Sequence, residues 1–216
     1  MTQPEPSSSL GVFIALEGGD GAGKSTQARL LSAWLAELGH TVVVTREPGG
    51  TEFGRAVREL VLHGGQVTPR AEALLFAADR AHHVETKIRP ALGRGEVVIT
   101  DRYMDSSIAY QGAGRDLGVE EVRDLNLWAT GGLVPDLTVL VDLPADVGRS
   151  RRHGVHDRLE SEPAQFHGAV RELFLTLAGA TPDRYLVVDG ELAPEQVHEL
   201  VRARVALLPE GLRVAL

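Results

Sequence analysis

Residues 18–25 have the residue types and the spacing of a phosphate-binding loop. Gly18, four residues, Gly23, Lys24 and Ser25 match G-x-x-x-x-G-K-[ST], between an apolar run and the start of a helical pattern. In such a loop the backbone N–H groups face the phosphates, the lysine adds a full positive charge, and the hydroxyl can ligate Mg²⁺. The motif predicts a nucleoside triphosphate site made by Gly18, Gly19, Asp20, Gly21, Ala22, Gly23, Lys24, Ser25 and Thr26.

Two further motifs place charged side chains where predicted strands end. Arg46 lies in "TREPGGT", and Asp101 and Arg102 lie in "VVITDRY". Open parallel sheets bind ligands at the carboxyl ends of their strands, so we expect these side chains to face the same crevice as the phosphate loop. An acidic residue at such a place usually organises Mg²⁺ or its waters, and the arginines suit a second anion.

An aromatic ring and a guanidinium share one side of a predicted helix. Phe76 and Arg80 are four residues apart in "LLFAADR", which places them on one helical face. A nucleobase needs a surface to stack on and donors for its edge. Taken singly, Phe76 is better explained as core and Arg80 as an ion-pair residue, and Arg46 is equally explained as a cap or salt bridge. Taken together, the motifs indicate two phosphate sites in one crevice with a base platform beside one, which is the layout of a nucleotide kinase.

Apolar runs and helical patterns alternate along the chain. Such alternation predicts an α/β fold with a parallel sheet and helices on both faces. The expected strands cover residues 11–16, 41–45, 96–100, 137–143 and 185–188. The expected helices cover residues 24–38, 52–63, 69–92, 119–130, 162–178 and 194–207.

Length and composition limit the classes of protein that fit. A chain of 216 residues favours one domain, over residues 11–216, and the polar residues 1–10 are expected to form a disordered tail rather than a signal peptide. The net charge of −8 argues against nucleic-acid binding, and no apolar stretch is long enough to span a membrane. The absence of cysteine excludes disulfides and a catalytic thiol. We expect a cytoplasmic protein.

The motifs together resemble those of the thymidylate kinase family, of bacterial type, whose members pass a phosphoryl group from ATP to dTMP. The resemblance rests on "LEGGDGAGKST", "TREPGGT", "LLFAADRAHH" and "TDRYMDSSIAYQG" in this order, and it runs from about residue 11 to the final helix. It implies a P-loop kinase fold with a five-stranded parallel sheet and a short lid insertion, use of Mg²⁺, and a homodimer.

The resemblance also implies roles for individual residues. Arg46 and Arg102 would grip the acceptor phosphate, Phe76 would stack on thymine, and Arg80 would bind its edge. Asp20, inside the phosphate loop, would face the 3′-hydroxyl of the acceptor sugar and could contact Mg²⁺. Three more residues would complete the dTMP site: Ser106 and Gln111 near the base or sugar, and Tyr110 where a ribose would carry its 2′-hydroxyl. The expected metal-binding residues are Ser25, Asp20 and Asp101.

The charged segment of residues 149–162, here called the lid segment, is a second expected source of catalytic charge. By composition alone, a solvated surface turn is the favoured interpretation. Some thymidylate kinases carry an arginine at the position of Gly21, so its absence favours the arrangement in which the lid supplies the catalytic arginine. We expect Arg151 or Arg158 in this role before Arg149 or Arg152. The expected catalytic residues are Lys24, Arg102, Asp20, Arg151 and Arg158.

These residues favour direct in-line transfer of the γ-phosphoryl group of MgATP to a phosphate oxygen of dTMP. That oxygen is already anionic near neutral pH, so the chemistry needs positioning and charge neutralisation rather than a strong base. Two alternatives remain at this point. One is another P-loop kinase with a small acceptor, a deoxynucleoside or a different monophosphate. The other is a nucleotide-dependent switch, although the sequence has no N-K-x-D element for guanine.

Overall fold

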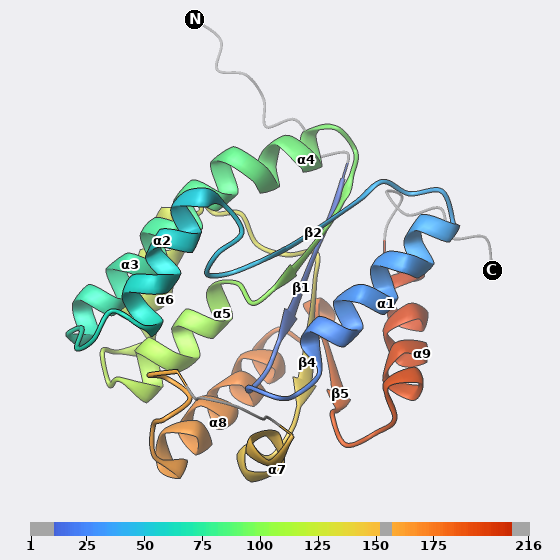
Figure 1. The fold of residues 1–216 in the computed structure, drawn as a ribbon. Helices are drawn as coiled ribbons and strands as arrows, with labels where there is room; N and C mark the ends of the chain where they lie inside the picture. Colours follow the sequence, from blue (N-terminus) through green and yellow to red (C-terminus); the bar gives the residue numbers. More distant parts are fainter. Residues whose placement is uncertain (1–10, 152–156, 209–216) are drawn as a thin grey trace, which may run out of the picture.

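Five parallel strands form the centre of the molecule in the order β2-β3-β1-β4-β5 (Figure 1). The computed structural model describes residues 11–151 and 157–208, so the predicted tail of residues 1–10 lies outside it. The sheet confirms the predicted fold class. Its strands are β1 (Val12–Glu17), β2 (Val42–Arg46), β3 (Val97–Asp101), β4 (Leu137–Asp142) and β5 (Tyr185–Asp189).

Helices cover both faces of this sheet, as Figure 1 shows. On one face lie α1 and α9, packed on alternate strand residues such as Ile14 and Leu16. The other face, which includes Phe13 and Ala15, packs against α4, α5 and α8, and α2 packs on α3. The helices are α1 (Lys24–Glu37), α2 (Glu52–Leu62), α3 (Pro69–His83), α4 (Arg89–Gly93), α5 (Met104–Ser107), α6 (Val119–Ala129), α7 (Ala145–Ser150), α8 (Ala164–Ala180) and α9 (Pro194–Val205).

The helical segments differ from the sequence prediction in three places. The helix expected over residues 69–92 is α3, a π-helical segment η1 (Val84–Ile88) and α4 in succession. A short helix, α5, and a second π-helical segment, η2 (Ile108–Gly114), follow β3 where no helix was predicted. The helix α7, also not predicted, comes before the expected lid segment and overlaps only its first two residues. Each missed element is short, so its hydrophobic periodicity is too brief to detect in the sequence.

No helix within residues 11–151 and 157–208 is long and apolar enough to cross a membrane.

The strand register brings the predicted charged positions together at one edge of the sheet. Asp101 pairs with Leu16 on one side and with Arg46 on the other, so these residues meet at the carboxyl edge of the sheet. The phosphate-binding loop begins at the same edge, directly after β1.

A buried carboxylate at this edge holds the first turn of α5. Glu17 accepts hydrogen bonds from the backbone N–H of Tyr103 at 2.8 Å and of Ser106 at 3.2 Å, and from the Ser106 hydroxyl at 2.6 Å. Its side chain is fully buried. Burial and repulsion from Asp105 raise the pKa of Glu17 from 4.5 to about 7. A long-range contact therefore stabilises a helix that has little propensity of its own.

This raised pKa predicts a pH-dependent stability. Between pH 4.5 and about 7 the folded state holds a proton on Glu17 that the unfolded state has released, so the Glu17 contribution to stability falls as pH rises. One such proton gives a limiting slope of about 1.4 kcal/mol per pH unit. In urea unfolding, the free energy of unfolding of wild type, relative to that of Glu17→Gln, should fall as pH rises through this window. Parallel pH profiles for the two proteins would contradict the prediction.

Candidate active site

The phosphate-binding loop joins β1 to α1 and is closed by its own lysine. Lys24, 6% exposed, donates from Nζ to the carbonyl oxygens of Gly18 at 3.1 Å and Gly19 at 2.7 Å. Burial and repulsion from Arg102 lower the pKa of Lys24 to about 8. Gly18 has φ +135°, and a Cβ there would lie 2.4 Å from the carbonyl oxygen of Val141, so only glycine fits. The loop therefore has the backbone and the charge that the motif predicts.

Ser25 and Asp101 place two oxygen ligands together beside the loop. The hydroxyl of Ser25, in the first turn of α1, donates to Oδ2 of Asp101 at 2.6 Å. Hydroxyl and carboxylate oxygens are the donors that Mg²⁺ prefers, and Mg²⁺ is commonly held by one or two protein ligands together with substrate phosphates. Among the described residues no cluster of three or more His, Asp or Glu side chains could hold a metal ion. This pair thus fits a metal bound jointly with phosphates rather than a protein cage.

Asp20 points away from the loop interior and into a polar cluster with Arg102 and Tyr110. Arg102 Nη2 donates to Asp20 Oδ1 at 2.5 Å, and the Tyr110 hydroxyl donates to Asp20 Oδ2 at 3.2 Å. Arg102 also donates to the Gly18 carbonyl at 3.2 Å and to the Ser106 hydroxyl at 3.0 Å. Burial raises the pKa of Tyr110, so its hydroxyl keeps the proton that it donates. The negative charge inside the phosphate loop is therefore matched by a guanidinium.

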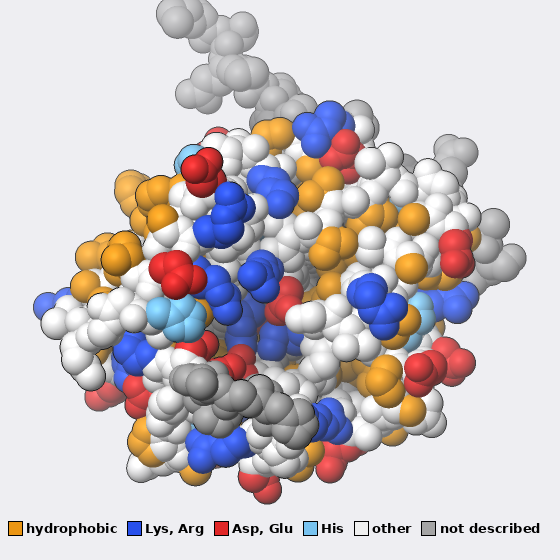
Figure 2. Space-filling model, in the orientation of Figure 1, with side chains coloured by type: hydrophobic (Ala, Val, Ile, Leu, Met, Phe, Trp, Pro, Cys, Tyr) orange, Lys and Arg blue, Asp and Glu red, His pale blue; other side chains and the backbone are white. Residues whose placement is uncertain are grey.

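A pocket next to this cluster contains most of the predicted acceptor residues. Phe76, Arg80, Arg102, Ser106, Tyr110 and Gln111 all line it, together with Asp20. The neighbouring cleft at the phosphate loop shares Asp20 and Arg102 with it and is lined also by Lys24, Ser25 and Asp101. Arg46 lines that cleft and not the pocket with Phe76. Figure 2 shows Lys and Arg side chains gathered around a hollow on this face.

Arg80 is one of the most buried large side chains of the protein, at 2% exposure. Its Nε donates to Glu47 Oε2 at 2.7 Å, its Nη2 donates to the Tyr103 carbonyl at 3.0 Å, and its Nη1 donates to Ser107 at 3.0 Å and also to Asn126. A guanidinium has five N–H groups, so one on Nη2 remains for a partner in the pocket.

Glu47 is held from its other side by a histidine. Its Oε1 lies 2.8 Å from Nδ1 of His83, whose Nε2 lies 2.7 Å from the hydroxyl of Thr45. The peptide bond between Glu47 and Pro48 is cis. This buried chain of contacts connects the "TREPGGT" segment after β2 to the helix α3, which carries Phe76 and Arg80.

The three described lid arginines, Arg149, Arg151 and Arg158, point in different directions. Arg151 Nη1 donates to the Gly190 carbonyl at 2.8 Å, and Arg151 lines the cleft at the phosphate loop. Arg158 donates to the Val61 carbonyl at 2.9 Å and to the buried carboxylate of Glu72, away from that cleft. Arg152 lies outside the described residues. Of the two arginines predicted first, the geometry brings Arg151 and not Arg158 to the loop.

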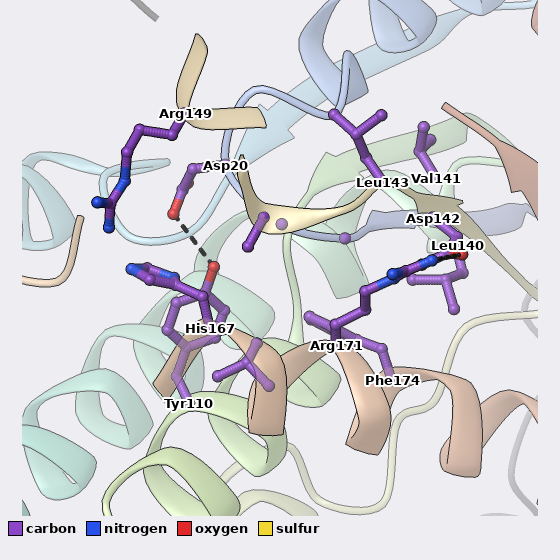
Figure 3. A pocket seen from close by; sticks show the side chains of 14 residues that line it. Asp20, Tyr110, Leu140, Val141, Asp142, Leu143, Arg149, His167, Arg171 and Phe174 are labelled. Atoms are coloured by element: carbon purple, nitrogen blue, oxygen red, sulfur yellow. Dashed lines mark hydrogen bonds and ion pairs between the residues drawn. The ribbon is translucent and has the colours of Figure 1, made fainter. Parts of the chain in front are cut away.

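Arg149 lies on the far side of the loop, over a small pocket between the phosphate loop and α8 (Figure 3). Its guanidinium points toward Asp20 and His167, while Tyr110 forms part of the pocket wall. At the other end of the pocket Arg171 donates from Nε and Nη2 to Asp142 at 2.7 and 2.8 Å. That bidentate pair fixes the end of β4 to α8.

Several residues of the site were not predicted from the sequence: Glu17, Glu47, Arg58, Glu72 and His83. Arg58 lines both the Phe76 pocket and the cleft at the loop. Burial and repulsion from Arg46 lower its pKa. A signal for Arg58 was present, because it shares the buried face of α2 with Gly54, Val57 and Val61. A half-buried arginine on an otherwise apolar helix face indicates a partner.

Comparisons with known proteins agree with the geometry. A family model described as thymidylate kinase matches residues 16–201. Thymidylate kinase of Clavibacter michiganensis subsp. michiganensis is 60% identical over 206 residues, covering 93% of this chain and 98% of the relative. Thymidylate kinase of Leifsonia xyli subsp. xyli is 57% identical over 204 residues, covering 93% and 97%.

A solved structure shows the same fold. The crystal structure of thymidylate kinase from Ehrlichia chaffeensis matches with a TM-score of 0.75 and 32% sequence identity, covering 90% of this chain and 98% of that chain. Two independent kinds of likeness, in sequence and in structure, thus cover nearly the whole molecule. The chain therefore belongs to the thymidylate kinase family, and it is an enzyme of the nucleoside monophosphate kinase class.

Proposed function

We propose that this cleft transfers the γ-phosphoryl group of MgATP to dTMP, giving ADP and dTDP, with ATP on the phosphate loop and dTMP in the pocket of Phe76. The observation that carries the proposal is the position of Arg102. It contacts the loop through Gly18 and Asp20 and the acceptor pocket through Ser106 and Tyr110. One guanidinium therefore lies where the two phosphate groups would meet.

Mg²⁺ would be held by Ser25 and Asp101, whose oxygens already lie together. When bound, the metal neutralises charge on the triphosphate oxygens. Asp20 stays a predicted third contact, although its carboxylate is shared with Arg102 and Tyr110. Its position in the acceptor pocket supports the other predicted role, contact with the sugar hydroxyl.

Arg58 joins Arg102 and Arg46 as a proposed ligand of the acceptor phosphate. Both Arg46 and Arg102 repel the charge on Arg58 and contribute to its lowered pKa. A dianionic phosphate placed among these guanidinium groups would relieve that repulsion, which makes binding favourable. Arg46 reaches this phosphate from the cleft side.

Phe76 and Arg80 suit a base. The ring of Phe76 lines the pocket, and Arg80 is held by four acceptors that leave it little freedom. A donor fixed in this way can read a carbonyl oxygen of thymine without losing side-chain entropy on binding. Tyr110, held by Asp20 and Arg102, stands in the same pocket and would exclude a ribose 2′-hydroxyl.

Catalysis depends on positively charged side chains that line the cleft before the substrates bind. An oxygen of the dTMP phosphate attacks the γ-phosphorus, and the bond from that phosphorus to the β,γ-bridging oxygen breaks, leaving ADP. No proton has to be removed from the acceptor oxygen. Lys24 and Arg102, which both line the cleft, neutralise the negative charge, and Arg151 adds a third cation from the lid segment.

A homodimer is supported by exposed apolar side chains on three adjacent helices. Phe53 and Leu60 on α2, Leu74 on α3 and Trp128 on α6 are 45%, 54%, 58% and 82% exposed. The helix pairs α2 with α3 and α3 with α6 pack together, so these side chains lie on neighbouring elements (Figure 1). Such groups favour contact with a second copy. The substrates, ATP and dTMP, support a cytoplasmic location.

The acceptor should be identified by ADP release across dTMP, dUMP, UMP, CMP, AMP and thymidine, with and without Mg²⁺. We expect Mg²⁺-dependent release with dTMP and poor release with UMP, because UMP carries a 2′-hydroxyl. Faster turnover of thymidine than of dTMP would overturn the acceptor assignment. Turnover that is indifferent to every monophosphate would instead indicate a nucleotide-dependent switch.

Replacing lid arginines should separate their roles. Arg151→Ala removes a cation from the cleft and should lower kcat by about 10³-fold or more. Arg158→Ala leaves that cleft unchanged and should act mainly on the KM for dTMP, because Arg158 contacts Glu72 beside the acceptor pocket. Steady-state kinetics with both substrates measures both effects. Wild-type kcat in Arg151→Ala would show that its guanidinium does not serve the transferring phosphoryl group.

The homodimer predicts a particle of twice 23.2 kDa in sedimentation equilibrium. Trp128→Glu places a charge on the proposed contact face and should shift the protein toward monomer. Leu207→Glu is the matched control, since Leu207 is 75% exposed but lies beyond α9 and not on α2, α3 or α6. A dimer that persists in Trp128→Glu, or dissociates in Leu207→Glu, would place the interface elsewhere.

A further inference from the structure

Glu72 is a fully buried carboxylate beside the acceptor pocket that has no place in the chemistry described above. It lies in the first turn of α3 and is 0% exposed. Its Oε1 accepts from Gln111 Nε2 at 2.8 Å and from Arg115 Nε at 3.2 Å, and its Oε2 accepts from Arg158. It does not line the pocket itself, whereas Gln111 does.

These contacts determine how the amide of Gln111 is turned. Two arginines balance the charge of Glu72, and a carboxylate oxygen can only accept hydrogen bonds. The NH₂ group of Gln111 must therefore face Glu72, and the amide cannot exchange its nitrogen and oxygen without losing that bond. Within the described residues, Oε1 of Gln111 accepts no hydrogen bond. The side chain consequently offers the pocket an acceptor rather than a donor.

Arg80, which lines the same pocket, offers a hydrogen-bond donor. Four of its N–H groups are used by protein acceptors, and the remaining one is a donor. A donor and an acceptor in one pocket match the edge of thymine or uracil, where a carbonyl oxygen adjoins a ring N–H. Cytosine presents an amino group beside an unprotonated ring nitrogen, which is the reverse pattern.

We propose that Glu72 is a positioning residue for base selection: it turns Gln111 so that the pocket accepts a ring N–H and rejects cytosine. The inference rests on the proposed function, since it requires a pyrimidine monophosphate in the Phe76 pocket. Glu72 acts through Gln111 and touches no substrate.

The test is the ratio of the dissociation constants for dCMP and dTMP, measured by calorimetry on the full chain. Wild type should bind dTMP more tightly. Glu72→Gln can donate or accept, so Gln111 can turn over, and the ratio should fall by about tenfold, the loss of one hydrogen bond of about 1.4 kcal/mol. Arg115→Ala is the control: it removes another contact of Glu72, leaves the Gln111 bond in place, and should keep the ratio.

An exchange of the two side chains makes the test specific. In Glu72→Gln with Gln111→Glu, residue 72 can donate and residue 111 is a pure acceptor, so preference for dTMP should return. A ratio unchanged in Glu72→Gln, or not restored by the exchange, overturns the inference.

A second variant tests the same inference without changing Glu72. If Glu72→Gln does not fold, as thermal melting would reveal, Gln111→Leu alone should still lose the preference, and an unchanged ratio there overturns the inference. Failure of wild type to bind dTMP overturns the proposed function instead.

Discussion

Arg102 adopts a backbone conformation that most residues avoid, and the proposed position of both phosphate groups depends on it. Its φ of 70° lies in the left-handed region, where a side chain with a Cβ is strained. The conformation is fixed from both ends: the Arg102 N–H donates to the Leu16 carbonyl at 2.9 Å, and its carbonyl accepts from the Thr100 hydroxyl at 2.9 Å. The turn sends the guanidinium across the end of β1 toward Gly18 and Asp20. The strained backbone at Arg102 thus holds its guanidinium in contact with both the phosphate loop and the pocket.

Buried carboxylates hold the rest of the site in place in the same manner. Glu17 fixes the turn that carries Ser106, Glu47 fixes Arg80, and Glu72 fixes Gln111. Burying a carboxylate is unfavourable unless its hydrogen bonds are satisfied, and each of these three carboxylates has such bonds. These carboxylates fix the side chains of the pocket before a ligand binds, which lowers the entropy lost on binding. They also determine which side chains donate hydrogen bonds and which accept them.

The sequence predicted the sheet well and its buried polar contacts poorly. Strands such as β3 and β5 lie within about one residue of the expected ranges, because apolar runs buried on both faces are distinctive. The motifs with Lys24 and Arg102 could be placed at the sheet edge by the same logic. The partners of Glu47 and Glu72 could not, since they join residues tens of positions apart through single hydrogen bonds. No periodicity records such pairs, and only the folded arrangement reveals them.

The backbone of the phosphate loop also leaves no room for an arginine at position 21. Gly21 has φ +78°, and a Cβ there would lie 2.3 Å from the carbonyl oxygen of Gly148 in α7. A Cβ at Gly148 would in turn lie 2.3 Å from the carbonyl oxygen of Asp20. Loop and lid helix thus meet backbone to backbone, at a distance that excludes an arginine at position 21 unless α7 moves away. The same close contact fixes the start of the lid segment against the loop, so that Arg151, directly after α7, reaches the cleft. One pair of glycines therefore both excludes a side chain at position 21 and brings Arg151 to the cleft.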